Sequence, residues 1–270
     1  MPERYILDKV LKAGVLYRAE DDKYFVIEAA GTNSVGKGSL VVDGSVVLEL
    51  NGRVARLEQT HTNRFPPLAL GKNSVVIPPK KPFSFSGDSG SYLRVRGSLM
   101  VLGPGEGVLT PHLARFSEQP KKYYTYEEGI NGIGASATWA ADAEYTVIDV
   151  TCPPGERWTF DRYLRVERTG IIADDIVGVV ALKFYLNDRP LDIIDPSLSP
   201  RGVDTLAGHY YEGTTSYFTP VDLIDMPIVL EPGRNLKIKA VNISGAAITT
   251  EAGEEAKVKV SIVKQRELLT

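Results

Sequence analysis

The sequence has few of the residues that usually reveal an activity. Its 270 residues contain 1 cysteine and 3 histidines. Because Cys152 is alone, no disulfide can form within the chain, and its apolar surroundings predict a small buried side chain rather than a nucleophile. His61, His112 and His209 lie far apart and show no metal-binding spacing. The sequence therefore predicts neither a cofactor nor a metal site, and no enzymatic activity.

Long apolar runs and an excess of one charge are also missing. No run of about 18 apolar residues occurs, so no membrane span is expected. The first residues lack a basic region followed by an apolar stretch, so we expect no signal peptide and synthesis in the cytoplasm of a host. The net charge of -3 provides no basic surface, and nucleic acid is not an expected partner.

Helical periodicity is scarce, and only residues 8–13 and 140–144 are weak candidates for helices. What the sequence does contain is alternating apolar and polar residues between turn residues. Residues 39–42 and 45–50 flank Asp43-Gly44, the commonest two-residue hairpin signal. Asn51-Gly52 is a second such signal and leads into residues 53–59. The pattern predicts a three-stranded meander.

The same alternation recurs along the rest of the chain and predicts an all-β fold. The further strands are expected at residues 23–29, 74–77, 82–85, 92–102, 145–152, 157–168, 177–186, 210–218, 228–230, 236–243 and 257–264. The length suggests two domains, and residues 111–128 are polar and rich in tyrosine. We expect two antiparallel β-sandwich, jelly-roll-like domains at 1–118 and 145–270, joined by a polar, Tyr-rich linker at 119–144.

One turn-and-strand phrase occurs twice. Pro78-Pro79-x-x-x-Phe83-x-Phe85 recurs as Pro153-Pro154-x-x-x-Trp158-x-Phe160, and each copy is followed by Tyr-Leu-Arg-Val, at residues 92–95 and 163–166. Proline cannot donate to a strand ladder, so each phrase predicts a turn and then a half-buried strand. The repeat reflects either a duplication of the domain or the ordinary reuse of turn residues in β proteins.

Residues 31–39 nearly form a phosphate-binding loop. Such a loop needs Gly-x4-Gly-Lys, then a Ser or Thr hydroxyl for magnesium, and then a helix. Gly31, Gly36 and Lys37 fit the pattern, but Gly38 replaces the hydroxyl residue and a predicted hairpin follows. We expect no nucleotide site here.

Three regions are candidates for contacts with other molecules. The tyrosine cluster is either a contact patch or packing against a domain. The polar loop at 192–208 is long enough to carry binding or assembly contacts, although its acidic residues are also typical of solvated turns or calcium ligands. Residues 1–11 and 266–270 are candidate arms. The candidate interaction residues are Tyr123, Tyr124, Tyr126, Asp192, Asp195, Arg201, Tyr210 and Tyr211.

Two stretches of the second half carry a family resemblance. They are Val150-Thr-Cys-Pro-Pro-Gly-Glu-Arg-Trp-Thr-Phe-Asp-Arg-Tyr-Leu-Arg-Val166 and Leu230-Glu-Pro-Gly-Arg-Asn-Leu-Lys-Ile-Lys-Ala-Val-Asn242. In both, a Pro-Gly turn opens a strand. This resembles β-sandwich structural proteins of tailed bacteriophages and related archaeal viruses. The resemblance covers about half of the chain and implies a virion structural protein.

From this resemblance we expect a non-enzymatic virion protein that forms a capsid, decorates it or occupies its vertices. Its partners would be other copies of itself and other virion subunits, and its location the virion. The alternative is a carbohydrate-binding or adhesion module, because a set of aromatic residues could form a platform on which a glycan stacks, namely Trp139, Trp158, Tyr210, Tyr211, Tyr217 and Phe218.

Overall fold

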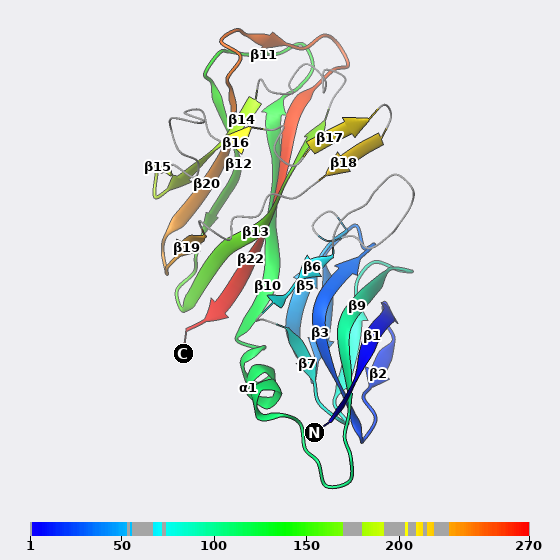
Figure 1. The fold of residues 1–270 in the computed structure, drawn as a ribbon. Helices are drawn as coiled ribbons and strands as arrows, with labels where there is room; N and C mark the ends of the chain where they lie inside the picture. The colour runs from blue at the N-terminus through cyan, green and yellow to red at the C-terminus, as the bar shows by residue number, and fades with distance from the viewer. Residues whose placement is uncertain are drawn as a thin grey trace. The chain divides into compact units, whose positions relative to one another are not determined.

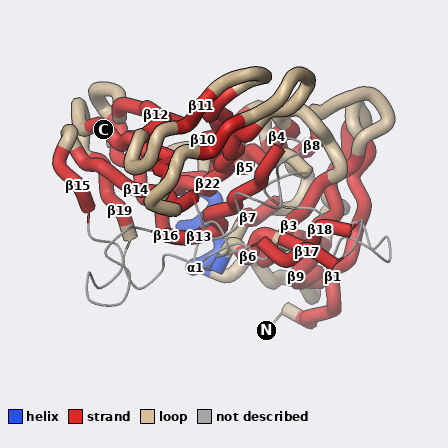
Figure 2. The backbone as a smooth tube through the Cα atoms, turned by 90° about the horizontal axis from the view of Figure 1, so that it is seen from above, coloured by secondary structure: helices blue, strands red, loops and turns tan. Residues whose placement is uncertain are grey.

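The structure is a computed structural model of the chain, and it describes residues 2–52, 55, 67–71, 74–169, 180–191, 203–204, 209–212, 215–218 and 227–269. Over these residues the protein is all-β, with several mainly antiparallel sheets (Figure 1). A tube view coloured by secondary structure shows the same dominance of strands, with α1 (Thr110–Glu118) as the helix among the described residues (Figure 2). The expected all-β class is confirmed.

The chain divides into two compact units. Unit 1 contains residues 1–126 and 265–269, and unit 2 contains residues 127–264 and 270. Strand β10 (Lys122–Ile133) passes from unit 1 into unit 2, and strand β22 (Ala256–Leu268) passes back. The chain therefore changes unit within two strands.

Unit 1 is built from two sheets. The first has the order β1-β9-β3-β6, with β7 also paired to β3, and the second has the order β10-β5-β4-β8-β2 within this unit. The strands of unit 1 are β1 (Glu3–Lys12), β2 (Leu16–Arg18), β3 (Lys23–Thr32), β4 (Gly38–Val42), β5 (Ser45–Leu50), β6 (Leu68–Ala69), β7 (Val75–Ile77), β8 (Pro82–Ser86) and β9 (Tyr92–Val101). Phe25 of β3 packs edge-on against Phe83 of β8, with 5.7 Å between ring centroids, so the two sheets face each other.

The β4–β5 hairpin forms where the sequence predicts it. Val42 pairs with Ser45 across Asp43-Gly44, both of which have the positive φ angles that a two-residue hairpin turn requires. The third strand of the predicted meander, residues 53–59, falls almost entirely outside the described residues.

Helix α1 covers one edge of the first sheet of unit 1. The side-chain amide of Gln119, just after the helix, accepts a bond from the backbone N–H of Val76 at 2.9 Å and donates to the Val76 carbonyl at 3.0 Å. Arg115 Nε donates to the carbonyl of Ser74 at 2.8 Å. These side chains take the place of a neighbouring strand beside β7 and satisfy backbone groups that an edge would leave open.

In unit 2 two larger sheets share one apolar core, and β11 with β21 and β17 with β18 form two additional two-stranded sheets. One sheet has the order β12-β20-β14-β15, with β16 beside β14, and the other has the order β19-β13-β22-β10 within this unit. Side chains from both sheets, including Phe160, Phe184 and Ile238, form one buried cluster. The strands of unit 2 are β11 (Thr138–Trp139), β12 (Glu144–Thr151), β13 (Glu156–Thr169), β14 (Val180–Leu186), β15 (Arg189–Leu191), β16 (Val203–Asp204), β17 (His209–Glu212), β18 (Thr215–Phe218), β19 (Ile228–Leu230), β20 (Asn235–Asn242) and β21 (Ile248–Thr249).

The expected helices and arms are wrong. Residues 8–13 belong to β1 or follow it, and residues 140–144 are turn and strand. The N-terminal segment is no free arm, because all of β1 pairs with β9, from Glu3 opposite Val101 to Lys12 opposite Tyr92. Residues 266–268 lie in β22, and the Leu268 N–H donates to the carbonyl of Lys121 at 2.7 Å. Strand pairing outweighed the weak helical pattern.

The structure does not confirm a Tyr-rich linker at 119–144. Most of that segment is strand, in β10 and β11. Gly129 and Gly132 mark close approaches of the backbone, since a Cβ there would lie 1.8 Å from the Val147 carbonyl oxygen and 2.2 Å from the Ala256 carbonyl oxygen, respectively. The predicted strand at 210–218 is two strands, β17 and β18, which pair as a hairpin.

Both copies of the repeated phrase place their aromatic residues in a core. Phe83 and Phe85 on β8 are buried, as are Trp158 and Phe160 on β13. The Tyr-Leu-Arg-Val that follows lies on a separate strand, β9, in the first copy but on the same strand, β13, in the second. In the first copy six residues separate Phe85 from Tyr92 and include the turn between β8 and β9, whereas in the second copy two residues separate Phe160 from Tyr163.

Candidate interaction surface

The predicted tyrosine patch lies in the interior of unit 1. Tyr123, Tyr124 and Tyr126 are consecutive or nearly so on β10, and each is at most 8% exposed. Arg266 Nη1 donates to the Tyr123 hydroxyl, and Lys37 Nζ lies 5.8 Å from the centroid of the Tyr126 ring. Burial on both sides of β10 explains why residues on both of its faces are apolar. The tyrosines follow the packing alternative rather than the contact-patch alternative.

The other candidate residues can be placed only in part. Asp192, Asp195 and Arg201 lie outside the described residues. Tyr210 and Tyr211 are on β17, opposite Tyr217 and Ser216 of β18, and their side chains are outside the described part of the chain. Assembly contacts in the loop at 192–208 therefore stay a prediction.

The loop that resembles a phosphate-binding loop holds an anion from its own chain. The backbone N–H groups of Val35 and Gly36 donate to Asp88 Oδ2 at 2.7 and 2.8 Å, and Ser34 Oγ donates to the same oxygen at 3.0 Å. These bonds lower the pKa of Asp88, and the bond from the Gly36 N–H has the largest effect. Consecutive amides thus bind the carboxylate of a neighbouring turn, and the chain continues into β4 rather than a helix.

The reactive side chains that the structure describes serve packing. Cys152 is fully buried, as expected, and burial raises the pKa of its thiol. His112 Nδ1 lies 3.0 Å from the Tyr24 hydroxyl oxygen, and burial lowers the pKa of the imidazole. Within the described ranges, no cluster of three His, Cys, Asp or Glu side chains is arranged to hold a metal ion. No helix described here is long and apolar enough to cross a membrane.

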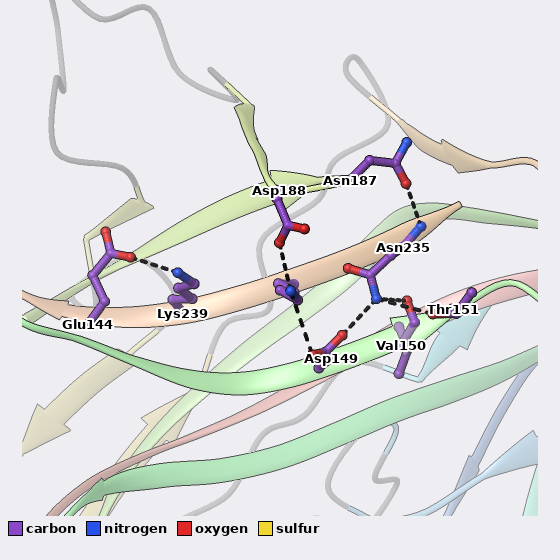
Figure 3. A network of polar contacts seen from close by, with 9 residues as sticks. Glu144, Asp149, Val150, Thr151, Asn187, Asp188, Asn235 and Lys239 are labelled. Carbon is purple, nitrogen blue, oxygen red and sulfur yellow. Dashed lines mark hydrogen bonds and ion pairs between the residues drawn. The ribbon is translucent and has the colours of Figure 1, made fainter. Parts of the chain in front are cut away.

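Unit 2 presents a sheet face on which charged residues pair across strands (Figure 3). Glu144 of β12 accepts from Lys239 of β20 at 3.0 Å, and from Lys183 Nζ and the Tyr185 hydroxyl of β14 at 3.2 and 2.7 Å. Burial alone would raise the pKa of Glu144, but the bonds from Tyr185, Lys239 and Lys183 outweigh it and lower the pKa. Burial and the bond to Glu144 raise the pKa of Tyr185 to about 12.

The same face continues toward Asn235. Lys237 Nζ lies 2.6 Å from Asp188 Oδ1, and Asn235 Nδ2 donates to Asp149 Oδ1 at 2.7 Å (Figure 3). The Asn235 N–H donates to Asn187 Oδ1 at 2.9 Å, next to the turn between β14 and β15. Opposite charges facing each other on neighbouring strands stabilise a sheet. We interpret this face as a structural network.

Exposed apolar side chains are concentrated in one short stretch of the sequence of unit 1. Five of the ten large apolar side chains that are exposed in the described chain lie between residues 5 and 16, in β1, in β2 and in the turn that joins them. Ile6 is 92% exposed and Leu16 is 74% exposed. The five are Tyr5, Ile6, Val10, Val15 and Leu16. Soluble proteins rarely expose such a cluster without a use for it.

Strand β1 is also an edge of its sheet. It pairs with β9 along its whole length and has no strand on its other side in the described chain (Figure 1). Leu7 and Leu11 are buried on its inner face, while Ile6 and Val10 alternate with them on the outer face. A ten-residue edge with exposed apolar side chains offers both backbone hydrogen bonds and apolar area to another strand. We refer to residues 3–16, which comprise β1 and the residues that follow it as far as Leu16, as the β1 edge.

Sequence reasoning missed the β1 edge. It expected a helix at residues 8–13, and the short segment before it seemed an arm. The local sequence does not indicate a strand, because Ile6, Leu7, Val10 and Leu11 are apolar while Asp8, Lys9 and Lys12 are charged. This spacing of about four residues is closer to the period of a helix than to the alternation of a strand, so only the pairing with β9 identifies β1.

No protein family profile and no curated protein matches the chain. Solved structures similar to it include the major capsid protein P2 of bacteriophage PM2, with 11% identity and a TM-score of 0.37 over 98% of each chain. The VP2 subviral particle of infectious bursal disease virus has 11% identity and a TM-score of 0.22 over 100% of this chain and 77% of that one. BuGH86 in complex with neoagarooctaose has 9% identity and a TM-score of 0.23 over 94% of this chain and 34% of that one.

These neighbours thus include viral capsid proteins and a protein bound to an oligosaccharide. Their low TM-scores mean that none of them identifies the function of this chain.

Proposed function

We propose that the protein is a non-enzymatic structural subunit of a virus particle, which forms, decorates or caps a capsid through contacts of its two jelly-roll-like β domains. The β1 edge is the observation that carries the assembly part. It combines a strand of 10 residues, paired on one side only in the described chain, with apolar side chains that face solvent. Pairing this edge would bury both at once.

The virion part of the proposal rests on the resemblance of residues 150–166 and 230–242 to phage and archaeal virus proteins. In the structure these stretches form strand β13 with its preceding turn, and strand β20 with its own. Trp158 and Phe160 of β13 are core residues of unit 2. Rigid domains of this kind suit a particle, in which symmetry multiplies weak contacts between copies.

The glycan alternative has less support among the described side chains. Trp139 and Trp158, two members of the suggested stacking platform, are buried, and Trp139 Nε1 donates to the Ala143 carbonyl at 2.9 Å. A buried indole cannot stack on a sugar.

Light scattering on the native protein tests the proposal. We expect a discrete oligomer, or a fraction that purifies together with a viral shell and is detected there by an antibody against this chain. A mass that stays monomeric at all concentrations, together with saturable binding on a glycan array, would instead establish the carbohydrate-binding alternative.

A further inference from the structure

We propose that the β1 strands of two copies pair antiparallel about a two-fold axis that passes beside Ile6. In such a dimer, the sheet of unit 1 that contains β1 would continue from one copy into the same sheet of the other copy. The inference rests on the proposed function, since it names the partner and the geometry of one assembly contact. The partner is a second copy of this chain.

The outer side of β1 is open. Every residue of β1 has a partner on β9, and the bonds from the strand's backbone to groups beyond β9 are at its end, where the Lys12 N–H donates to the Tyr17 hydroxyl at 2.9 Å and the Lys12 carbonyl accepts from the Val15 N–H at 3.3 Å. This holds for the part of the chain that the structure describes. The edge formed by β7 in the same sheet is closed by Gln119. The fold thus covers one edge and leaves the other available.

Symmetry limits how two β1 strands can pair. A two-fold axis perpendicular to the sheet places the inner faces of the two copies on the same side of the joined sheet. Two residues that lie directly opposite each other then point to the same face, and each is the same number of residues away from the residue at the axis. With the axis at Ile6, the residue pairs are Glu3 with Lys9, Arg4 with Asp8, Tyr5 with Leu7, and Ile6 with Ile6. Opposite charges face each other at both ends, and apolar side chains meet in the centre.

Other positions of the axis give poorer pairs. An axis at Asp8 places Asp8 opposite its own copy and Arg4 opposite Lys12, and an axis at Lys9 places two lysines together. Like charges directly opposite each other destabilise a sheet. An axis at Leu7 sets Ile6 against Asp8 and Tyr5 against Lys9. Axes at Tyr5 or Val10 pair about half of each strand.

Glu3 and Lys9 of β1 form no ion pair with the described residues of their own copy. The Lys9 ammonium lies 5.5 Å from the ring centroids of Tyr17 and Phe25, and no carboxylate among the described residues pairs with it. Glu3 accepts a bond from the Tyr5 hydroxyl at 2.5 Å and has no cation beside it in the described chain. The Ile6 axis brings each of these charges the partner that it lacks.

The Arg4–Asp8 pair contributes less, because both residues already have partners. Asp8 accepts two hydrogen bonds from the Arg94 guanidinium, at 2.7 and 2.5 Å. This interaction is the largest cause of the lowered pKa of Asp8. Arg4 Nε donates to Ser98 Oγ at 2.7 Å. The charge test of the register therefore uses Glu3 and Lys9.

Disulfide trapping tests the position of the axis. An Ile6→Cys variant places two thiols directly opposite each other, within reach of a disulfide, and its exposed side chain makes the change harmless to the fold. In a Val10→Cys control, the two thiols would be about 27 Å apart along the strands. Under mild oxidation we expect at least about tenfold more covalent dimer from Ile6→Cys than from Val10→Cys. Equal yields would overturn the register.

Charge reversal tests the pairing itself. In the dimer, position 3 of each copy faces position 9 of the other. Glu3→Lys alone therefore creates two lysine–lysine pairs, and Lys9→Glu alone creates two glutamate–glutamate pairs. Each variant should weaken self-association about tenfold or more. Mixing the two variants restores both pairs and should give a heterodimer, detected by native mass spectrometry. Circular dichroism checks that each variant is folded. If Lys9→Glu does not fold, the self-association of Glu3→Lys and the disulfide yield of Ile6→Cys decide whether the pairing is correct. Singles that dimerise like the wild type, or a folded mixture that stays monomeric, would refute the pairing.

Failure of this inference can be told apart from failure of the proposed function. If the native protein forms oligomers while Ile6→Cys yields no more covalent dimer than Val10→Cys, the β1 pairing is wrong and assembly uses another surface. If the native protein is monomeric and is absent from shells, both are wrong.

Discussion

The Gly97→Ala variant should lose about 3 kcal/mol or more of its free energy of unfolding, because the added methyl group has no space. Gly97 lies in β9, opposite Leu7 of β1 and Ile27 of β3. A Cβ at this position would lie 2.1 Å from the Val26 carbonyl oxygen and 2.8 Å from the Glu28 backbone nitrogen. The residue also has a φ of 157°, where it faces a bulge in β3 between Ile27 and Ala29.

Urea unfolding of the two proteins measures this loss. Gly107→Ala is the matched control, since a Cβ there meets no atom within 4 Å and the backbone is not left-handed, so the change should be neutral or slightly stabilising. Because β9 supports β1, Gly97→Ala should also reduce the yield of the Ile6→Cys dimer. A loss of less than about 0.5 kcal/mol would mean that β9 and β3 do not approach as described.

The Glu127→Ala variant should lose about 3 kcal/mol of the free energy of unfolding of unit 2, since it takes a carboxylate partner away from a buried ammonium group. The Lys264 side chain is 5% exposed, and its Nζ lies 2.5 Å from Glu127 Oε1. The same Nζ lies 3.0 Å from the centroid of the Trp158 ring. The ring attracts the cation, but it does not replace the negative charge of the lost carboxylate.

Two further variants separate the ion pair from a general effect of substitution. Glu128→Ala removes a partner whose Oε2 is 3.9 Å from Lys259 Nζ at a more exposed site, so it should cost no more than about 0.5 kcal/mol. Adding Lys264→Met to Glu127→Ala removes the buried ammonium group that has lost Glu127 and should recover most of the loss, as measured by thermal or urea unfolding. A double variant as unstable as Glu127→Ala alone would contradict the assignment.

The sequence was most informative where turn residues and alternation coincided. Asp43-Gly44 predicted the β4–β5 hairpin, and Ile228–Leu230 is the strand β19 that alternation indicated. The helix α1 was missed, because a nine-residue polar segment with Pro111 at its start has no side-chain cap and reads as a loop. What stabilises it is tertiary: Arg115 and Gln119 bind backbone groups near β7.

The interaction surface could be predicted only in part. The tyrosines of β10 were candidates for exposure because tyrosine is common at interfaces, but a strand covered on both faces buries them. Exposure of Ile6 depends on which strand ends the sheet, and pairing of β1 with β9 joins residues that are about 90 positions apart in sequence. A local pattern gives the period of a strand but not its neighbours.

Hydrogen exchange of the β1 backbone amides, measured on the wild-type chain at low and at high concentration, tests most directly whether this edge is an assembly surface. In an antiparallel strand, alternate N–H groups point to opposite neighbours, so half of those in β1 are already bonded to β9. We expect the others to exchange about tenfold more slowly at high concentration, with the strongest protection around Ile6. Rates in β1 that do not change while the protein oligomerises would contradict the central claim.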